Sequence, residues 1–330
     1  MSNDIVPAPP SSSGIWDKIV EVVGDLNLPK LVAGPAGEAI SRLIAGGADI
    51  PAAWLQQKAQ AIKDKTEAKS LMTKTLAGAS VELVKNDPAL VQRAAEAFIA
   101  KEIRHQHNRE AVAVKAIEDL RNTPEAETTK PDDDWLNVFS RYAEAASSER
   151  LQETWGRILS GQLKRPKAFS LQTLRFVSEL DEEIVSLFEK WSINVTNSDF
   201  IPFPANQGAE FTELLQLEDY GLIAGITGQI SKMFSEGDMN LPSQITIVPL
   251  TFQFKSHLLI VESKRPVSST FRACLLTRIG REIWPITKTP GSLEPLKAFA
   301  EQFPKNNIEK ISYVPLSGGA AVQLWQKPTE

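Results

Sequence analysis

Residues 134–191 constrain the fold of this chain most strongly, because their apolar side chains recur at spacings of three and four residues. The first of four such segments carries Trp135, Val138, Phe139 and Tyr142 on one helical face. The other three carry apolar residues at the same spacing: Leu151, Trp155, Ile158 and Leu159; Leu171, Leu174 and Val177; Ile184, Leu187, Phe188 and Trp191. Short connections join the four segments, so we expect a compact helical bundle, whose domain we place at residues 132–192.

Residues that favour helix ends flank these segments. Three aspartates at 132–134 precede the first helix, and one of them is expected to accept hydrogen bonds from its first N–H groups. Ser148 precedes the second helix, and Gly161 is typical of its end. Ser170 is the expected cap of the third. A metal site at the aspartates is the less favoured interpretation, because no further oxygen ligands lie at suitable spacing.

The second and third helices also carry a family resemblance. It rests on Trp155-Gly156-Arg157-Ile158-Leu159-Ser160-Gly161, then on Phe169-Ser170-Leu171, Leu174 and Leu180. These residues resemble the core of the bacterial domain-of-unknown-function family DUF2806 and, more distantly, abortive-infection (Abi-alpha-type) phage-defence proteins. The resemblance covers residues 135–191 well and the C-terminal part loosely. It implies a bacterial, intracellular protein and favours a defence role, and it brings no activity, cofactor or catalytic residue.

Length and charge limit the other possibilities. A chain of 330 residues is long enough for two or three domains. Residues 1–120 carry 14 basic and 15 acidic side chains, residues 121–200 carry 10 and 14, and the rest carry 12 and 12. No segment has a basic excess, so the electrostatic pattern of a dedicated nucleic-acid binder is missing.

The expected cellular compartment is inferred from cysteine usage and from the hydropathy pattern. Cys274 is the one cysteine, so the chain can form no internal disulfide, and its apolar surroundings favour a buried core residue. The sequence has no signal-peptide pattern at its start and no window of eighteen uncharged apolar residues. We expect a cytoplasmic protein, with peripheral contact at the inner membrane as the alternative.

For the N-terminal part, the sequence predicts a disordered leader over residues 1–14 and a helical domain over residues 15–122. Pro88 is expected to begin a long helix that lies antiparallel to the one before it. A polar belt over residues 101–110, which includes His105 and His107, is expected on its surface. Residues 123–131 have the composition of a linker.

Small residues over positions 31–55 leave two interpretations of the start of this domain. The favoured one is a tightly packed helical hairpin, because small side chains let helices approach closely. The other is a surface that meets a partner helix or a membrane. The candidate interaction residues are Trp16, Ile40, Leu43 and Trp54.

The last part, residues 200–330, mixes both kinds of secondary structure. Alternating apolar residues predict strands at 245–254, 258–261, 272–276, 308–314 and 320–325, with helices at 211–217, 277–284 and 293–303. A helix that ends in Gly221-Leu222-Ile223, followed by strands and a short helix after Thr277, is similar to a winged-helix arrangement. The expected fold is therefore mainly α with an α+β C-terminal domain that contains winged-helix-like elements.

Two candidate sites accompany this plan. Arg157, Lys164, Arg165 and Lys167, with Arg175, are candidates for a basic patch that contacts phosphates. Glu262 and Lys264 follow a predicted strand and resemble half of a PD-(D/E)xK nuclease metal site. A charged strand end is the favoured interpretation of the second pair, because no upstream acidic residue lies clearly on a neighbouring strand.

The leading functional hypothesis is a non-enzymatic interaction or regulatory protein, with anti-phage defence as its expected process. Self-association, a protein partner or membrane-surface contact would act through its N-terminal helices, and we expect neither a cofactor nor a metal. The second hypothesis is DNA binding by the winged-helix-like part together with Lys164, Arg165 and Lys167. The third is a divergent nuclease that uses Glu262 and Lys264.

Overall fold

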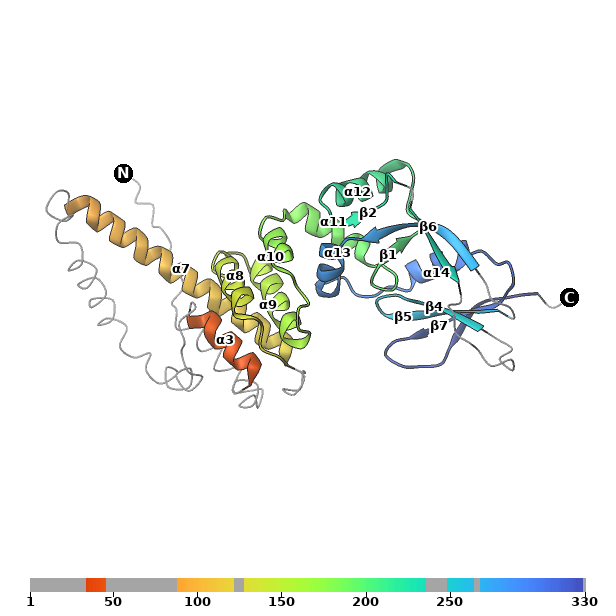
Figure 1. Cartoon of the computed structure of the whole chain (residues 1–330), viewed down its shortest axis with the longest axis horizontal. Helices are drawn as coiled ribbons and strands as arrows, with labels where there is room; N and C mark the ends of the chain where they lie inside the picture. Colours follow the sequence, from red (N-terminus) through yellow and green to blue (C-terminus); the bar gives the residue numbers. More distant parts are fainter. Residues whose placement is uncertain are drawn as a thin grey trace, which may run out of the picture. The chain divides into compact units, whose positions relative to one another are not determined.

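The computed structural model describes residues 34–45, 88–121, 128–228, 230–235, 248–263 and 268–328 (Figure 1). Helices make up the earlier part of these residues, and helices with two small antiparallel sheets make up the later part, which confirms the predicted fold class. The described chain forms two compact units and passes from the first to the second after Leu174. The predicted domain boundaries stay predictions. The expected leader at 1–14, Trp16, Trp54 and Lys264 lie outside the described residues.

The first unit is built around one long helix. Its elements are α3 (Pro35–Ala45), α7 (Pro88–Leu120), α8 (Asp133–Ala143) and α9 (Glu149–Lys164). Helix α9 lies along the second half of α7, and α3 and α8 also contact α7 (Figure 1). The next helix, α10 (Leu171–Ser178), contains the point at which the first unit ends. Among the residues of α7 whose burial the structure describes, the buried ones all lie between Asn108 and its end.

The predicted helix starts are confirmed by their hydrogen bonds. Asp132 accepts from the backbone N–H groups of Asp134 at 3.0 Å and Trp135 at 3.2 Å. Ser148 accepts from Leu151, and Ser170 accepts from Thr173, both at 3.3 Å. Each of these side chains satisfies N–H groups that have no partner within the helix.

The predicted end of α9 at Gly161 is wrong, because the helix continues to Lys164. A methyl group on Gly161 would lie 2.8 Å from the ring of Phe169. This glycine therefore makes room for the Phe169 side chain and does not end the helix.

Aromatic side chains fill the centre of the first unit. Trp135 stacks on Phe139 with ring centroids 5.1 Å apart, and Phe139 meets the edge of Trp155 at 5.5 Å. The indole N–H of Trp135 donates to the backbone oxygen of Phe169 at 2.8 Å. The side-chain oxygen of Gln162 accepts from the backbone N–H of Phe169 at 2.9 Å. Trp135 of α8 and Gln162 of α9 thus hold Phe169, in the segment after α9, against these two helices.

The second unit begins with helices α11 (Glu182–Ser192) and α12 (Gly208–Asp219). Strand β6 (Ser268–Leu276) pairs antiparallel with β1 (Phe200–Pro202), β2 (Ile223–Ala224) and β3 (Ser231–Ser235). The sequence predicted β6 and missed β1, β2 and β3. Strands β1 and β2 have three and two residues, which show too little alternation to be recognised. The winged-helix resemblance of this part stays a prediction.

The second sheet has the strand order β4-β5-β7-β8, with β4 (Val248–Gln253), β5 (His257–Ser263), β7 (Ile308–Pro315) and β8 (Val322–Gln326). All its pairs are antiparallel. Helix α13 (Arg278–Ile283), the 3-10 helix Trp284–Ile286 and α14 (Glu294–Gln302) complete the unit. Phe252, Phe271, Phe299 and Phe303 form the centre of its core.

Candidate functional site

Helix α7 has two halves with different surroundings. From Asn108 to Leu120 most side chains are buried against α3, α8 and α9. Before Asn108, large apolar side chains remain exposed: Leu90 at 56%, Phe98 at 51% and Ile103 at 54% of their surface. This first half, residues 88–107, extends beyond the helices that pack on the second half (Figure 1). We call it the α7 arm.

A polar network marks the point where the α7 arm meets the packed half. Arg109 is buried and donates to Glu144 at 2.9 Å and to the side-chain oxygen of Gln106 at 2.9 Å. The amide of Asn108 donates to the backbone oxygen of Glu144 at 2.8 Å. The expectation of an exposed polar belt over residues 101–110 is therefore wrong for residues 108–110, which are buried. These side chains are buried because they bond the last turn of α8.

A second polar cluster fastens α7 to α9. Ser160, which is fully buried, donates to the Asp119 carboxylate at 2.5 Å. Lys164 donates to the same carboxylate at 2.8 Å and to the backbone oxygen of Asp119 at 3.0 Å. Burial by itself would raise the pKa of Asp119, but the bonds from Lys164 and Ser160 outweigh it and hold this pKa below its usual range. Ser160 has no access to solvent, so its hydroxyl cannot reach a substrate as a nucleophile. The cluster therefore serves to connect α7 and α9.

Two of the four residues of the candidate basic patch are engaged in ion pairs. Arg157 pairs with Glu153 at 3.0 Å, one turn away on α9, and Lys164 pairs with Asp119. Arg165 and Lys167 are exposed in the turn that follows α9. The structure thus leaves Arg165 and Lys167 as the accessible cations of the four, and their predicted contact with phosphate stays a prediction.

The candidate interaction residues that the structure describes are buried. Ile40 is 5% exposed and Leu43 is 0% exposed. Both lie on α3, which packs against α7. In this structure they belong to the core of the first unit and offer no accessible surface to a partner.

Of the candidate nuclease pair, Glu262 belongs to the described residues and Lys264 lies outside them. Glu262 lies near the end of β5, opposite Lys310 on β7, and the two side chains approach to 3.7 Å. Among the described residues, no group of three or more His, Cys, Asp or Glu side chains is placed to hold a metal ion. Glu262 therefore has an ion-pairing neighbour in the sheet, and the described residues add no second metal ligand to it.

Two findings bear on the remaining expectations from the sequence. Cys274 is buried in β6, as expected, and burial raises the pKa of its thiol to about 12. A thiol with so high a pKa is a poor nucleophile at neutral pH. None of the helices in the described part of the chain is long and apolar enough to cross a membrane.

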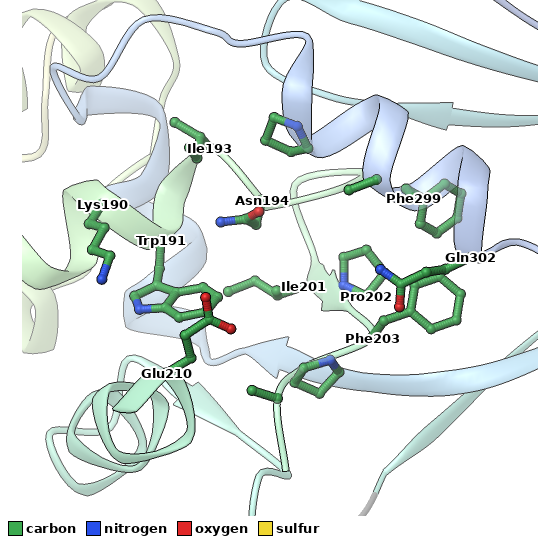
Figure 2. A pocket seen from close by; sticks show the side chains of 14 residues that line it. Lys190, Trp191, Ile193, Asn194, Ile201, Pro202, Phe203, Glu210, Phe299 and Gln302 are labelled. Atoms are coloured by element: carbon green, nitrogen blue, oxygen red, sulfur yellow. The ribbon is translucent and has the colours of Figure 1, made fainter. Parts of the chain in front are cut away.

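A pocket of about 250 Å³ lies in the second unit and was not predicted from the sequence. Its walls come from the end of α11, the segment around β1, the start of α12 and the helix α14 (Figure 2). Aromatic rings and prolines supply much of the lining: Trp191, Phe203, Phe299, Pro202, Pro204 and Pro295. Residues that are far apart in the sequence form this pocket, so no local sequence motif predicted it.

The backbone at one wall of this pocket is strained. Phe203 has a φ angle of +48°, in the left-handed region that non-glycine residues rarely adopt. Its N–H donates to the backbone oxygen of Arg272 at 2.9 Å, and its ring packs 4.9 Å from Phe271 and 5.6 Å from Phe299. These contacts hold the Phe203 side chain in place at the pocket. Strained residues of this kind concentrate at binding sites.

The polar groups of the lining differ in whether they already have partners. Lys190 donates to the two oxygens of Glu213 at 2.7 and 2.6 Å, and the Trp191 indole N–H donates to the same carboxylate at 2.9 Å. The hydrogen bond from Lys190 holds the pKa of Glu213 below its usual range. By contrast, the side chains of Asn194, Glu210 and Gln302 form no hydrogen bond or ion pair within the described part of the chain.

Residues 92–200 match the family model DUF2806. The description of that family is a protein of unknown function. The match confirms the resemblance predicted from residues 135–191, and it includes most of the α7 arm and the Lys190–Asn194 side of the pocket. No curated protein and no solved structure matches the chain. The more distant resemblance to abortive-infection proteins stays a prediction.

Proposed function

We propose that this chain is a non-enzymatic interaction protein that associates with a second copy of itself through the α7 arm. The observation that carries this proposal is the exposure of more than half of the Leu90, Phe98 and Ile103 side chains on one helical segment. Large apolar side chains gathered on one surface mark interaction sites more often than single exposed ones.

The arrangement of the arm suits helix-to-helix packing. Leu90, Ala94 and Phe98 form one row at intervals of four residues, and Ala95, Ile99 and Ile103 form the adjacent row. Each row is a ridge of residues four apart, the kind of ridge that packs into a groove of another helix, and Leu90 and Ile103 lie on different sides of the arm. Leu90, Phe98 and Ile103 are each about half exposed, so burying the rest of each side chain would contribute about half of the 1.5–3 kcal/mol of a fully exposed one, or roughly 1 kcal/mol.

The charges of the arm favour another copy over a membrane or a nucleic acid. Residues 88–107 carry Arg93, Lys101 and Arg104 together with Glu96 and Glu102. A twofold contact needs a surface that complements itself, and mixed signs on one helix satisfy this condition. Anionic lipid or nucleic acid would favour a segment that is predominantly basic.

The test is the mass of the full chain in solution as a function of concentration, for the natural sequence and for Phe98→Glu. We expect the natural chain to form a dimer. Phe98→Glu should weaken association at least about tenfold, since loss of a hot-spot residue costs about 2 kcal/mol or more and the substitution also places a charge in the contact. Multi-angle light scattering after size exclusion measures this directly.

Ala100→Glu is the matched control, because Ala100 is exposed on the same arm and lies outside the two apolar rows. It adds the same charge and should leave the dimer intact. A natural chain that stays monomeric at all concentrations contradicts the proposal. Equal weakening by both substitutions would mean that added charge, and not the apolar face, causes the effect.

DNA binding is the second hypothesis, and the charges of the described residues argue against it. In a winged-helix arrangement, the helix before the strand hairpin would face the DNA. Here that helix is α12, which carries Glu210, Glu213, Glu218 and Asp219 and no basic residue. Four carboxylates on this helix would repel phosphates. If the winged-helix resemblance holds, it favours a protein contact.

Anti-phage defence is the cellular process that we propose for this interaction protein, on the basis of the sequence resemblance to abortive-infection proteins. The direct measurement is phage yield from cells that express the natural chain or Phe98→Glu. If association is required, protection should be present with the natural chain and reduced with Phe98→Glu. Equal phage yields with and without the natural chain would remove the defence role.

A further inference from the structure

We propose that the pocket of the second unit binds an arginine side chain from an exposed peptide segment of a partner protein. The inference goes beyond the proposed self-association, because it concerns the second unit and none of the residues of the α7 arm. It rests on the charge, the walls and the size of the pocket.

The charge of the lining favours a cation. Lys190 is the basic residue of the lining, and its ammonium is already held by the two oxygens of Glu213 at 2.7 and 2.6 Å. Glu210 lines the same pocket from the first turn of α12, is exposed, and forms no ion pair with the described residues. The negative charge that remains available is therefore the Glu210 carboxylate.

The walls favour a guanidinium group over an ammonium group. A guanidinium is planar, weakly hydrated and stacks on aromatic faces, and it presents five donors that match a carboxylate in pairs. Trp191 and Phe203 supply aromatic surface in the lining, and Glu210 supplies the carboxylate (Figure 2). A compact, strongly hydrated ammonium would use this surface less well.

The amide groups of the lining suit a peptide backbone. Asn194 reaches the pocket from the segment after α11, and Gln302 reaches it from α14 at the opposite end from Glu210 (Figure 2). Each side chain offers a donor and an acceptor. A peptide that inserts its arginine beside Glu210 can therefore pair its N–H and C=O groups with Asn194 and Gln302.

The size of the pocket limits the ligand. Pockets that enclose a whole drug-sized ligand have volumes of about 300–1,000 Å³. This pocket has a volume of about 250 Å³, which suits one inserted side chain and is small for a nucleotide cofactor. A single side chain of a longer segment fits this volume, while the rest of the segment stays outside.

The test measures binding of short acetylated peptides that differ only in their central residue, which is arginine, lysine or citrulline. Citrulline keeps the shape of arginine and removes its charge. We expect the arginine peptide to bind the full chain, the lysine peptide to bind more weakly and the citrulline peptide at least about tenfold more weakly. Isothermal titration calorimetry provides the affinities.

Two variants locate the binding. Glu210→Gln should weaken binding of the arginine peptide at least about tenfold. Asp219→Asn removes a charge from the other end of the same helix, outside the pocket, and should leave the affinity unchanged. Addition of the arginine peptide should also move the indole N–H resonance of Trp191, which is identified by its loss in Trp191→Phe. Thermal unfolding of each variant shows that it is folded.

Several results would overturn the proposal. Equal affinity for the arginine and citrulline peptides would remove the role of charge, and equal affinity for lysine would remove the role of the guanidinium. An unchanged affinity in Glu210→Gln, or a Trp191 resonance that does not move, would place the binding elsewhere. Equal affinity for acetylarginine amide alone would replace the peptide by a small guanidinium compound. Self-association through the α7 arm would be unaffected by any of these results.

Discussion

Asp119 shows how single residues hold the first unit together. Its carboxylate accepts from Ser160 on α9 and from Lys164 one turn later. The side chain is partly exposed, so solvent screens the ion pair with Lys164 and the hydrogen bonds contribute more than the charge. The sequence showed Lys164 only as one of several basic residues, because its partner lies 45 positions away.

Asp119→Asn is expected to lower the free energy of unfolding by about 1 kcal/mol at neutral pH, since an amide accepts less strongly than a carboxylate. The folded pKa lies below the usual value of 3.8, so the contribution of this carboxylate is present above that pH. It should disappear as the pH falls through the lowered pKa. Urea unfolding of both chains from about pH 7 to about pH 3 measures this difference.

Glu118→Gln is the control for this comparison, because Glu118 is the exposed neighbour on the same helix and its distance to Lys115 is 3.9 Å. It should change stability little at any pH. A stability difference for Asp119→Asn that persists unchanged at the acidic end would contradict the assigned role of the carboxylate.

At the scale of elements, the first unit depends on the close approach of α7 and α9. A methyl group on Gly156 would lie 2.6 Å from the Cβ atom of Lys115 and 2.9 Å from the backbone nitrogen of Ala116. Contacts this short do not occur with real side chains, so the helices can pack at this distance only with glycine at position 156. Gly156 belongs to the residues that carry the family resemblance, and the structure gives it this physical role.

Gly156→Ala is expected to lower the free energy of unfolding by about 1–3 kcal/mol, because the two helix backbones would have to move apart. Helix propensity alone predicts the opposite sign, a gain of about 0.8–1 kcal/mol. The sign of the change in the urea midpoint therefore decides between packing and propensity. Gly228→Ala is the control, because a methyl group there meets nothing within 4 Å. An unchanged or higher midpoint for Gly156→Ala would contradict the close packing.

At the scale of the whole molecule, charge separates the proposed functions. The chain has a net charge of −5, and its exposed cations are interspersed with carboxylates. Proteins that bind DNA without a large specific interface depend on a concentrated basic surface. The distribution of charge here suits contacts between proteins, in which ion pairs set orientation more than affinity.

We therefore expect the full chain to pass through a duplex-DNA column at low salt without retention. Lys164→Glu, Arg165→Glu and Lys167→Glu combined should behave in the same way. Retention that falls with added salt, and that the combined substitutions remove, would favour DNA binding over the proposed interaction role.

The parts of the fold that could be predicted from the sequence depend on neighbouring residues. Asp132, Ser148 and Ser170 act within three residues, so their positions in the sequence are enough to place the helix starts. Gly161 has the residue type of a helix end and serves another purpose, because Phe169 requires the space beside it. The short strands β1 and β2 exist because β6 offers them partners, and their own sequences carry no such signal.

The candidate sites depend on which distant residues meet. Ile40 and Phe98 are both apolar residues on helices, and the first is buried while the second is exposed. Their residue types do not distinguish them, because burial is decided by the elements that pack against each helix. For the same reason Glu210 and Gln302 gave no sign in the sequence that they line one pocket.

The sequence by itself determined the helical periodicity of residues 134–191, the caps, the α+β character of the C-terminal part and the DUF2806 resemblance. These properties follow from side-chain spacing and from hydrogen bonds within a few residues of one another. Only the tertiary structure decided that Lys164 is paired with Asp119, that the α7 arm is exposed and that a pocket forms beside Glu210. Pairing, burial and cavities are relations between residues that folding brings together from distant positions, and chain order alone does not specify them.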